Sequence, residues 1–243
     1  MTETTGKAES GRPLQGMFTA VPPRYDLINR IITWGLDRGW RRLAARECLL
    51  SSPRRVLDLC CGTGDLAVNL APPSAGGMAV TGLDYSLPML HIARDKVGRL
   101  AAGRAISFIC GDASRLPFAD GSFDVVGISF AWRNLTYQNR LVHHCLAEIR
   151  RVLVEGGRFV IVETSQPRLK VVRWLFHLYL RWLVYPAGYW LSGNRGAYRY
   201  LAESAARFYT ADEVSGLLLG AGFSRVSCRS RLWGAVAIHV AVR

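Results

Sequence analysis

The chain lacks the cysteine and histidine spacings that bind zinc. Its cysteines form no C-x-x-C pair and show no metal-like spacing with histidines. Most of them lie in apolar segments, which is typical of reduced core residues in a cytoplasmic protein. The cysteines are Cys48, Cys60, Cys61, Cys110, Cys145 and Cys228. We therefore predict no metal site.

The amino terminus also lacks the apolar core of a secretory signal. Residues 1–16 are polar and are predicted to be a disordered tail, whereas residues 17–243 are predicted to form a single domain. The apolar segment 170–191 is nearly long enough to span a bilayer, but Arg173 and Arg181 interrupt it, so we predict no transmembrane helix. With 243 residues and 50% hydrophobic content, the chain can bury a full α/β core. We expect it in the cytoplasm.

Residues 54–66, RRVLDLCCGTGDL, lack the phosphate-cradling signature G-x-x-x-x-G-K-[ST]. They instead predict a buried strand that runs into a turn at Gly62 and Gly64 and then into a helix. The third glycine of the dinucleotide fingerprint is replaced by Ala67, which that motif tolerates, so nicotinamide binding stays a rival. Asp58 lies near the carboxyl end of the strand, where open α/β sheets bind their ligands.

Three successive predicted strands end in an acidic residue: Asp58, Asp84 and Asp112. Because the carboxyl ends of parallel strands meet at one edge of a sheet, these carboxylates are expected to line one site. Asp84 is placed to accept hydrogen bonds from both ribose hydroxyls of an adenosine. Asp112 is placed to accept from the adenine amine, while Ala113 offers a backbone N–H to the ring. This arrangement indicates a nucleoside rather than a pyrophosphate.

Two segments are expected to lie outside the sheet. Residues 17–50 predict two helices, which either pack on the sheet or form a lid that holds Tyr25 over the mouth near Gly62. Residues 168–203 predict a cap insertion. Within it, 170–191 is an aromatic and aliphatic helix with one stripe of basic residues, which fits either a helix in a membrane interface or a core helix with a wet stripe. The stripe consists of Lys170, Arg173, His177 and Arg181.

The net charge of +13 and the pI near 10.0 indicate an anionic partner, either nucleic acid or acidic lipid. A generally basic proteome would give the same charge. The chain has no appended RNA-binding module, and its aromatic residues concentrate in an aliphatic helix instead of alternating with cations on a strand. We therefore expect no nucleic-acid partner. An RNA methyltransferase and a non-catalytic membrane-binding protein remain as rival interpretations.

Several motifs together resemble the quinone C-methyltransferases of menaquinone and ubiquinone biosynthesis, a family of S-adenosylmethionine-dependent enzymes. The resemblance runs from about Met17 to the carboxyl terminus and is carried by FTAVPPRYDLINRIITWGLDRGWRR, VLDLCCGTGDLA, LPFADGSFD, ISFAWRNLT, GGRFVIVETSQP and YRYLAESAARF. It implies the α/β, Rossmann-like fold of class I S-adenosylmethionine-dependent methyltransferases. That fold has a mostly parallel, seven-stranded sheet, here with a helical cap insertion.

The resemblance also implies site residues. The cofactor is expected to contact Gly62, Thr63, Asp84, Asp112, Ala113 and Ser129, and we add Asp58 and Gly64 from the same strand and turn. Arg133 is expected to stabilise the oxyanion of a quinol, Asn134 to orient a ring hydroxyl, and Tyr25 to close over the methionine end. The chain departs from the family pattern at Cys60-Cys61, at Ala131-Trp132, where Gly-Leu is commoner, and at Gln166, where lysine is frequent.

The predicted reaction is C-methylation of a reduced prenylated quinol, most simply of demethylmenaquinol to menaquinol, at a membrane surface that the protein contacts through 170–191. Reduction matters because a hydroquinone that loses a proton pushes electron density onto the adjacent ring carbon. The alternatives are a polyprenyl-methoxy-benzoquinol of ubiquinone biosynthesis, another small molecule, or RNA. The oligomeric state does not follow from the sequence.

Overall fold

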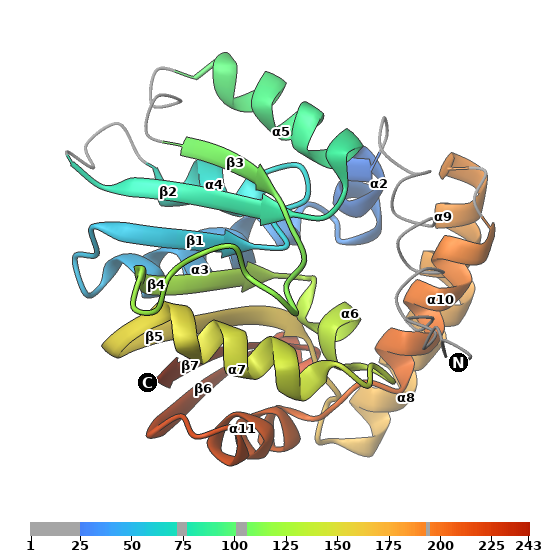
Figure 1. Ribbon diagram of the computed structural model, residues 1–243. Coiled ribbons are helices and arrows are strands. Elements are labelled where there is room, and N and C mark those ends of the chain that lie inside the picture. Colours follow the sequence, from blue (N-terminus) through green and yellow to red (C-terminus); the bar gives the residue numbers. More distant parts are fainter. Residues whose placement is uncertain (1–24, 72–76, 101–105, 193–194) are drawn as a thin grey trace, which may run out of the picture.

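The computed structural model describes residues 25–71, 77–100, 106–192 and 195–243. The predicted tail and the first part of the predicted lid, 17–24, lie outside these ranges. A seven-stranded sheet runs through the molecule in the order β3-β2-β1-β4-β5-β7-β6 (Figure 1). Its strands are β1 (Arg55–Leu59), β2 (Ala79–Asp84), β3 (Ile106–Cys110), β4 (Phe123–Ser129), β5 (Leu153–Thr164), β6 (Arg225–Arg231) and β7 (Val236–Val242). The first five pair in parallel and β7 is antiparallel, which confirms the predicted fold class.

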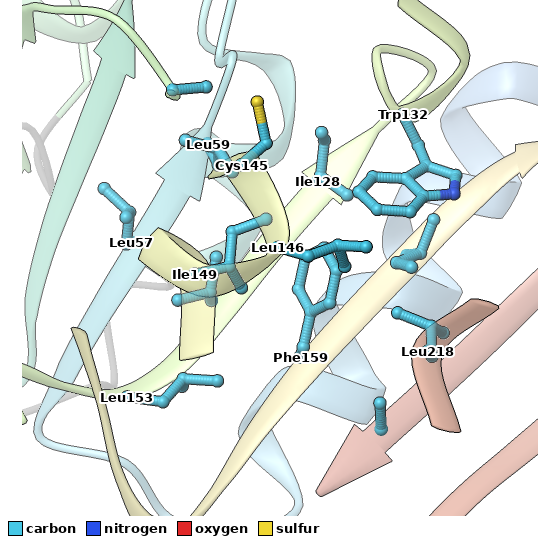
Figure 2. Packing of buried hydrophobic residues seen from close by; sticks show 14 of the residues in the cluster. Leu57, Leu59, Ile128, Trp132, Cys145, Leu146, Ile149, Leu153, Phe159 and Leu218 are labelled. Carbon is cyan, nitrogen blue, oxygen red and sulfur yellow. The ribbon is translucent and has the colours of Figure 1, made fainter. Parts of the chain in front are cut away.

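Both faces of the sheet are covered by helices, as the near-continuous apolar strands predict. On one face, α3 (Leu36–Leu49) and α4 (Asp65–Leu70) pack against strand residues such as Val56. On the other, α7 (Val142–Val152) lies over residues such as Leu57, and α11 (Ala211–Gly220) packs on β6 and β7 and adds Leu218 to the same core (Figure 2). Neighbouring strand residues therefore enter different cores. The remaining sheet helix, α5 (Leu87–Gly98), packs on β2 and β3.

A short helix, α6 (Trp132–Thr136), follows β4 and was not predicted from the sequence. Its first residue, Trp132, is fully buried and packs edge-on against Phe159, with ring centroids 5.5 Å apart (Figure 2). The chain enters this helix through Phe130, whose φ of 56° lies in the left-handed region that bulky residues seldom adopt. The buried indole thus fixes the two residues that follow it, Arg133 and Asn134, at the carboxyl end of β4.

The other helices form a cap with a small core of its own, which contains Ile28, Leu180, Val184 and Tyr198. The cap comprises α2 (Tyr25–Ile32), α8 (Lys170–Tyr179), the π-helical turn η3 (Leu180–Val184), α9 (Tyr185–Ser192) and α10 (Arg195–Ala206). In Figure 1 its carboxyl-terminal helices face the ends of the parallel strands. Within the described part of the predicted lid, residues 25–50, α2 belongs to the cap, whereas α3 packs on the sheet.

Local signals in the sequence agree with most of these elements. The predicted capping box is present: Thr210 Oγ1 accepts the Glu213 N–H at 3.3 Å, and Glu213 Oε2 accepts the Thr210 N–H at 2.7 Å. The predicted helix at 170–191 is observed as the succession α8, η3 and α9. Within the described ranges, no helix is long and apolar enough to cross a membrane.

Candidate functional site

A cavity of about 410 Å³ lies at the carboxyl ends of β1, β2, β3 and β4, and we call it the strand-end cavity. Its volume is in the range of small-molecule sites. Most of the predicted site residues line it: Tyr25, Gly62, Thr63, Asp84, Asp112, Ser129 and Asn134. The members of this set from Gly62 to Asn134 meet because parallel strands end at one edge, and Tyr25, 109 positions before Asn134, joins them from α2.

Asp84 closes one wall of this cavity. Its Oδ2 accepts the Gly62 N–H at 2.9 Å, and its Oδ1 accepts the Ser86 N–H at 2.9 Å. Burial raises the pKa of this carboxyl, and the backbone N–H groups of Ser86 and Gly62 oppose that rise. Each carboxylate oxygen keeps a further lone pair for a ligand. The bonds to Gly62 and Ser86 therefore hold the acceptor that the ribose prediction requires.

The turn after β1 takes a backbone path that most residues avoid. Cys60, Gly62 and Gly64 have φ values of 53°, 53° and 80°. At Gly64 a Cβ would lie 3.2 Å from the Cβ of Ala93 and 3.3 Å from Cζ of Phe108, so this glycine permits close packing as well as the turn. Gly64 forms the N-cap of α4 and is not among the lining residues of the cavity.

Two other predicted cofactor residues, Asp58 and Ala113, are also not among the lining residues of the strand-end cavity. Asp58 is 1% exposed, and its Oδ2 accepts the Ala67 N–H at 2.8 Å, which ties β1 to α4. Burial raises the pKa of Asp58 to about 8. The side chain of Ala113 is buried in the core shared with α7. The structure gives the Asp58 side chain a supporting position, whereas the expected contact of the Ala113 backbone N–H with the adenine ring stays a prediction.

A polar network joins the cap to the glycine turn. Thr63 Oγ1 donates to Asp26 Oδ1 at 2.7 Å, and Lys96 Nζ donates to Asp26 Oδ2 at 2.7 Å and to Asp65 Oδ1 at 2.5 Å. Asp26 belongs to α2, the adjacent residue to Tyr25. This network, which we call the α2 latch, holds Tyr25 over the strand-end cavity, and burial raises the pKa of that phenol.

A second cavity, of about 670 Å³, lies between the cap and the sheet, and we call it the cap cavity. Its lining is mainly apolar and comes from α2, α8, η3, α10 and the β6–β7 turn. The two cavities share the lining residues Tyr25, Arg41, Phe130 and Asn134. The strand-end cavity has a larger share of polar lining than the cap cavity, so a more polar and a mainly apolar compartment meet at these four side chains, which we call the junction.

Arg133 lines the cap cavity and is locked by a buried ion pair. Its Nη1 lies 3.3 Å from Glu163 Oε1 and donates to Thr164 Oγ1 at 2.9 Å. Its backbone N–H donates to Glu163 Oε2 at 3.0 Å. Because both side chains are at most 4% exposed, the pair is rigid and shielded from water. Glu163 thus sets the direction of the guanidinium.

Two buried polar atoms beside the junction have no hydrogen-bond partner among the described residues: Arg133 Nε and Asn134 Oδ1. The first is a donor and the second an acceptor. Buried polar groups are normally paired, so such atoms indicate a place for a ligand. Together they match a ligand that carries one oxygen to accept a hydrogen bond and one hydroxyl to donate one.

Sequence reasoning missed Arg41, a buried residue of α3 at the junction. Its Nε donates to Ser129 Oγ at 3.2 Å, its guanidinium pairs with Asp37, and its Cζ lies 5.1 Å from the centroid of the Phe130 ring. The Asp37/Arg41 spacing of four was a usable signal, because it puts an ion pair on one helix face. Only the fold shows that this face is buried.

One departure from the family pattern has a structural explanation. Trp132 lies in neither cavity, since its indole is buried in the sheet core, whereas Ala131 lines the strand-end cavity. The change at Trp132 therefore affects the position of α6 rather than the wall of a pocket. Among the described residues, no group of histidine, cysteine and acidic side chains is arranged to hold a metal ion.

Comparison with known proteins accounts for this arrangement. Residues 4–243 match the model of the ubiE/COQ5 methyltransferase family. The chain belongs to the ubiE/COQ5 methyltransferase family. This confirms the resemblance and the predicted methyltransferase, and it leaves the nicotinamide-binding, RNA-methyltransferase and non-catalytic interpretations without support.

Two relatives and one solved structure show the degree of similarity. The demethylmenaquinone methyltransferase of Deinococcus radiodurans is 41% identical over 96% of this chain and 94% of its own length. The ubiquinone/menaquinone biosynthesis C-methyltransferase UbiE of Geotalea uraniireducens is 34% identical over 96% and 97%. An O-methyltransferase family protein from Burkholderia thailandensis shares the fold with a TM-score of 0.65 and 14% identity, over 90% of this chain and 59% of that longer chain.

Proposed function

We propose that this ubiE/COQ5 family member transfers a methyl group from S-adenosylmethionine to a ring carbon of a reduced, prenylated naphthoquinol, converting demethylmenaquinol to menaquinol. The observation that carries the proposal is the junction, where a nucleoside-sized polar cavity meets a larger apolar one. The polar cavity suits the donor and the apolar cavity suits an isoprenoid chain. The name of the 41% identical relative supports the choice of a naphthoquinol.

The residues of the strand-end cavity fit S-adenosylmethionine. Asp84 and Asp112 supply acceptors for the ribose hydroxyls and the adenine amine, and Asp65, which also lines the cavity, supplies an anion for the methionine ammonium. Gly62 has open space beside its Cα, which leaves room for a ligand to approach the backbone. When bound there, S-adenosylmethionine supplies an electrophilic methyl group on a sulfonium.

The residues beside the junction are suited to activate and hold the quinol ring. The Arg133 Nε–H donates to one quinol oxygen and stabilises its deprotonated form, while Asn134 Oδ1 accepts from the other hydroxyl. The deprotonated oxygen pushes electron density onto the adjacent ring carbon, which forms the new carbon–carbon bond to the methyl group as the methyl–sulfur bond breaks and the sulfur leaves as a neutral thioether. The ring proton then leaves and restores the aromatic quinol. Tyr25 and Phe130 shield the junction from water.

The direct test is methyl transfer with radiolabelled S-adenosylmethionine and dithionite-reduced demethylmenaquinone. We expect label in the quinol, and none when the quinone is left oxidised, because an oxidised quinone is an electrophile and does not attack a sulfonium. The same experiment with a reduced polyprenyl-methoxy-benzoquinol measures acceptor choice. Faster labelling of the benzoquinol would overturn the naphthoquinol assignment in favour of the ubiquinone precursor, which the name of the 34% identical relative keeps open.

We further propose that the protein associates peripherally with membranes through α8, η3 and α9. Along this segment the exposed apolar side chains recur at helical spacing and form one stripe: Val171, Trp174, Leu175, Leu178 and Trp182. Arg173 and His177 of the predicted basic stripe are instead half-buried and bonded to the preceding loop, at Pro167 O and Gln166 Oε1. Apolar insertion, rather than a row of cations, is therefore the main contribution we expect.

A further inference from the structure

The mouth of the cap cavity is surrounded by exposed apolar side chains from three distant parts of the chain. They come from the α2–α3 turn, from α8 and from the β6–β7 turn, and they are Trp34, Leu36, Leu175, Leu232 and Trp233. Each is between 45% and 77% exposed although it lines a cavity. We call these five residues the collar. The same cavity ends at the buried Arg133, so it runs from solvent to the junction.

The two tryptophans of the collar occupy similar strained turns. Trp34 and Trp233 have φ values of 54° and 51°, and each is followed by a glycine, Gly35 or Gly234, with φ of 74° or 96°. Leu232 also has a positive φ, of 47°. Bulky residues rarely adopt this conformation, and where it persists it is concentrated at ligand clamps and other functional positions. Two separate turns thus hold an indole outward at one opening.

The surroundings of the collar carry mainly positive charge. The chain segments that supply it, 27–36, 168–202 and 224–243, contain no aspartate or glutamate. They do contain exposed arginines, of which Arg30 precedes the first collar turn, Arg231 adjoins the second, and Arg181 stacks against the exposed Trp182. Two acidic residues lie nearby, but Asp37 is buried and paired with Arg41, and Asp212 is paired with Arg168. The unpaired charge around the patch is therefore mainly cationic, which complements a bilayer with anionic head groups.

We infer that the collar is a membrane port: it inserts into an anionic bilayer with the cap cavity open toward the lipid, so that the quinol passes from the bilayer to the junction without crossing water. The isoprenoid chain occupies the cap cavity and leaves through the collar. This inference rests on the proposed function and adds to it the residues and the orientation of membrane contact. Tryptophan is suited to such a position because its indole prefers the head-group region.

A lipid surface fits the collar better than a second copy of this chain. Two collars brought together would place cations against cations, whereas anionic lipid neutralises them. The opening would also be closed in a dimer of that kind, although it leads to the junction. Self-association through the collar is therefore the rival outcome of the experiment.

The experiment compares two acceptors with full-length protein. One is demethylmenaquinol embedded in vesicles of equal parts phosphatidylglycerol and phosphatidylcholine, and the other is a reduced naphthoquinol without a prenyl chain, dissolved in buffer. The Trp34→Ser/Trp233→Ser variant is expected to lose about ten-fold or more in rate on the vesicle substrate, because it loses apolar area from the inserted surface. On the soluble substrate its rate should stay within about two-fold of wild type, a margin for side chains outside the junction.

Three further variants and a flotation measurement sharpen the result. Trp34→Phe/Trp233→Phe keeps the apolar character and should restore most of the vesicle rate. Leu50→Ser/Leu219→Ser removes two comparably exposed apolar side chains, 68% and 51%, from elsewhere on the surface and should leave both rates unchanged. Among the tryptophan and leucine variants, flotation with the same vesicles should fall only in Trp34→Ser/Trp233→Ser. Arg181→Glu removes a cation near the patch and should lower flotation more at low salt than at high salt.

The possible outcomes separate the inference from the function on which it rests. If wild type methylates neither acceptor, the proposed function fails. If it methylates both and the serine variant equals wild type on vesicles, the membrane port is wrong while the function stands. If sedimentation shows a dimer that the serine variant dissociates, and vesicles do not compete for it, the collar is a subunit interface and the lipid assignment is overturned.

Discussion

The strand-end cavity and the cap cavity meet at four side chains but are built in different ways. In the strand-end cavity the polar groups are held by short hydrogen bonds from turns that follow individual strands, as at Asp84 and Gly62. In the cap cavity the walls come from helices and turns far apart in the sequence, and the packing is mainly apolar. The strand-end cavity can recognise individual ligand atoms through directed hydrogen bonds, whereas the cap cavity can accept a flexible apolar chain by its shape.

The largest expected effect separates turnover from donor binding. In Arg133→Met/Glu163→Gln the buried charges are removed together, so no unpaired charge is left in the core and the fold should survive. We expect turnover to fall by roughly 10² to 10³, as for the loss of an oxyanion-stabilising donor. Donor affinity, measured by isothermal titration calorimetry with S-adenosylmethionine, should change little.

The single variant Arg133→Ala is the companion to that experiment. It leaves Glu163 buried without its partner, so we expect the free energy of unfolding to fall by about 3 kcal/mol or more.

In the double variant, a donor affinity that drops as steeply as turnover would show that Arg133 belongs to the strand-end cavity and not beside the quinol.

The next effect is on donor binding alone. In Asp84→Asn one carboxylate oxygen becomes an amide NH₂ that faces a backbone N–H of Gly62 or Ser86, so one of the two bonds is lost and two donors oppose each other. We expect S-adenosylmethionine affinity to fall by about ten-fold or more. Asp120→Asn, at a side chain that is 79% exposed, is the control and should bind normally. Equal affinities for the two variants would remove Asp84 from the donor site.

A smaller effect tests the connection between the two regions. Lys96→Met removes the cation of the α2 latch, and Arg94→Met removes a cation from the same helix without touching the latch. We expect faster amide hydrogen exchange in α2 and a several-fold higher KM for the donor in the first variant only, since a partly exposed ion pair contributes modestly. Similar exchange in both variants would mean that α2 is held by apolar packing alone.

The smallest effect concerns Asp58, behind the strand-end cavity. Its folded-state pKa of about 8 lies above the ordinary value of 3.8, so the folded state retains a proton that the unfolded state has lost. The contribution of this carboxyl to stability is complete below pH 3.8 and is lost as pH rises through about 8. Asp58→Asn resembles the protonated acid, so it should be more stable than wild type by at least about 1 kcal/mol above pH 8 and similar to it near pH 4.

Urea unfolding followed by circular dichroism at several pH values measures this difference. Subtracting the two profiles cancels the other titrating groups, among them Asp84, whose pKa is also raised. A constant difference between pH 4 and 9 would contradict the buried, protonated state of Asp58.

The sequence is informative where function depends on residues close together in the chain. The glycine turn after β1, the acids at the ends of three strands and the capping box at Thr210 are local patterns, and the structure has all of them where they were predicted. Adjacent parallel strands end at the same edge of a sheet, so the fold brings the three strand ends together. The strand-end cavity was therefore predictable, apart from the supporting positions of Asp58 and Gly64.

The cap side was less predictable, because its features depend on which face of a helix is covered. In the sequence, Arg41 resembles the surface cations around it. In the structure, α3 buries its side chain against Ser129 and Phe130. In the sequence, Arg173 and His177 look like part of a solvent-exposed basic stripe. In the structure, their side chains hydrogen-bond to the loop that precedes α8. Trp34 and Trp233 are far apart in the sequence, and no motif connects them. Only the fold brings both of them to the cap cavity.

The sequence by itself determined the fold class, the family and the polar half of the site, because these follow from strand patterns and short motifs whose geometry is local. Only the tertiary structure decided that the apolar half is a cavity, that it meets the polar half at Tyr25, Arg41, Phe130 and Asn134, and that it opens through the collar. The physical reason is that apolar packing has no directional signature in sequence, so the neighbours of an apolar side chain are set by the whole fold.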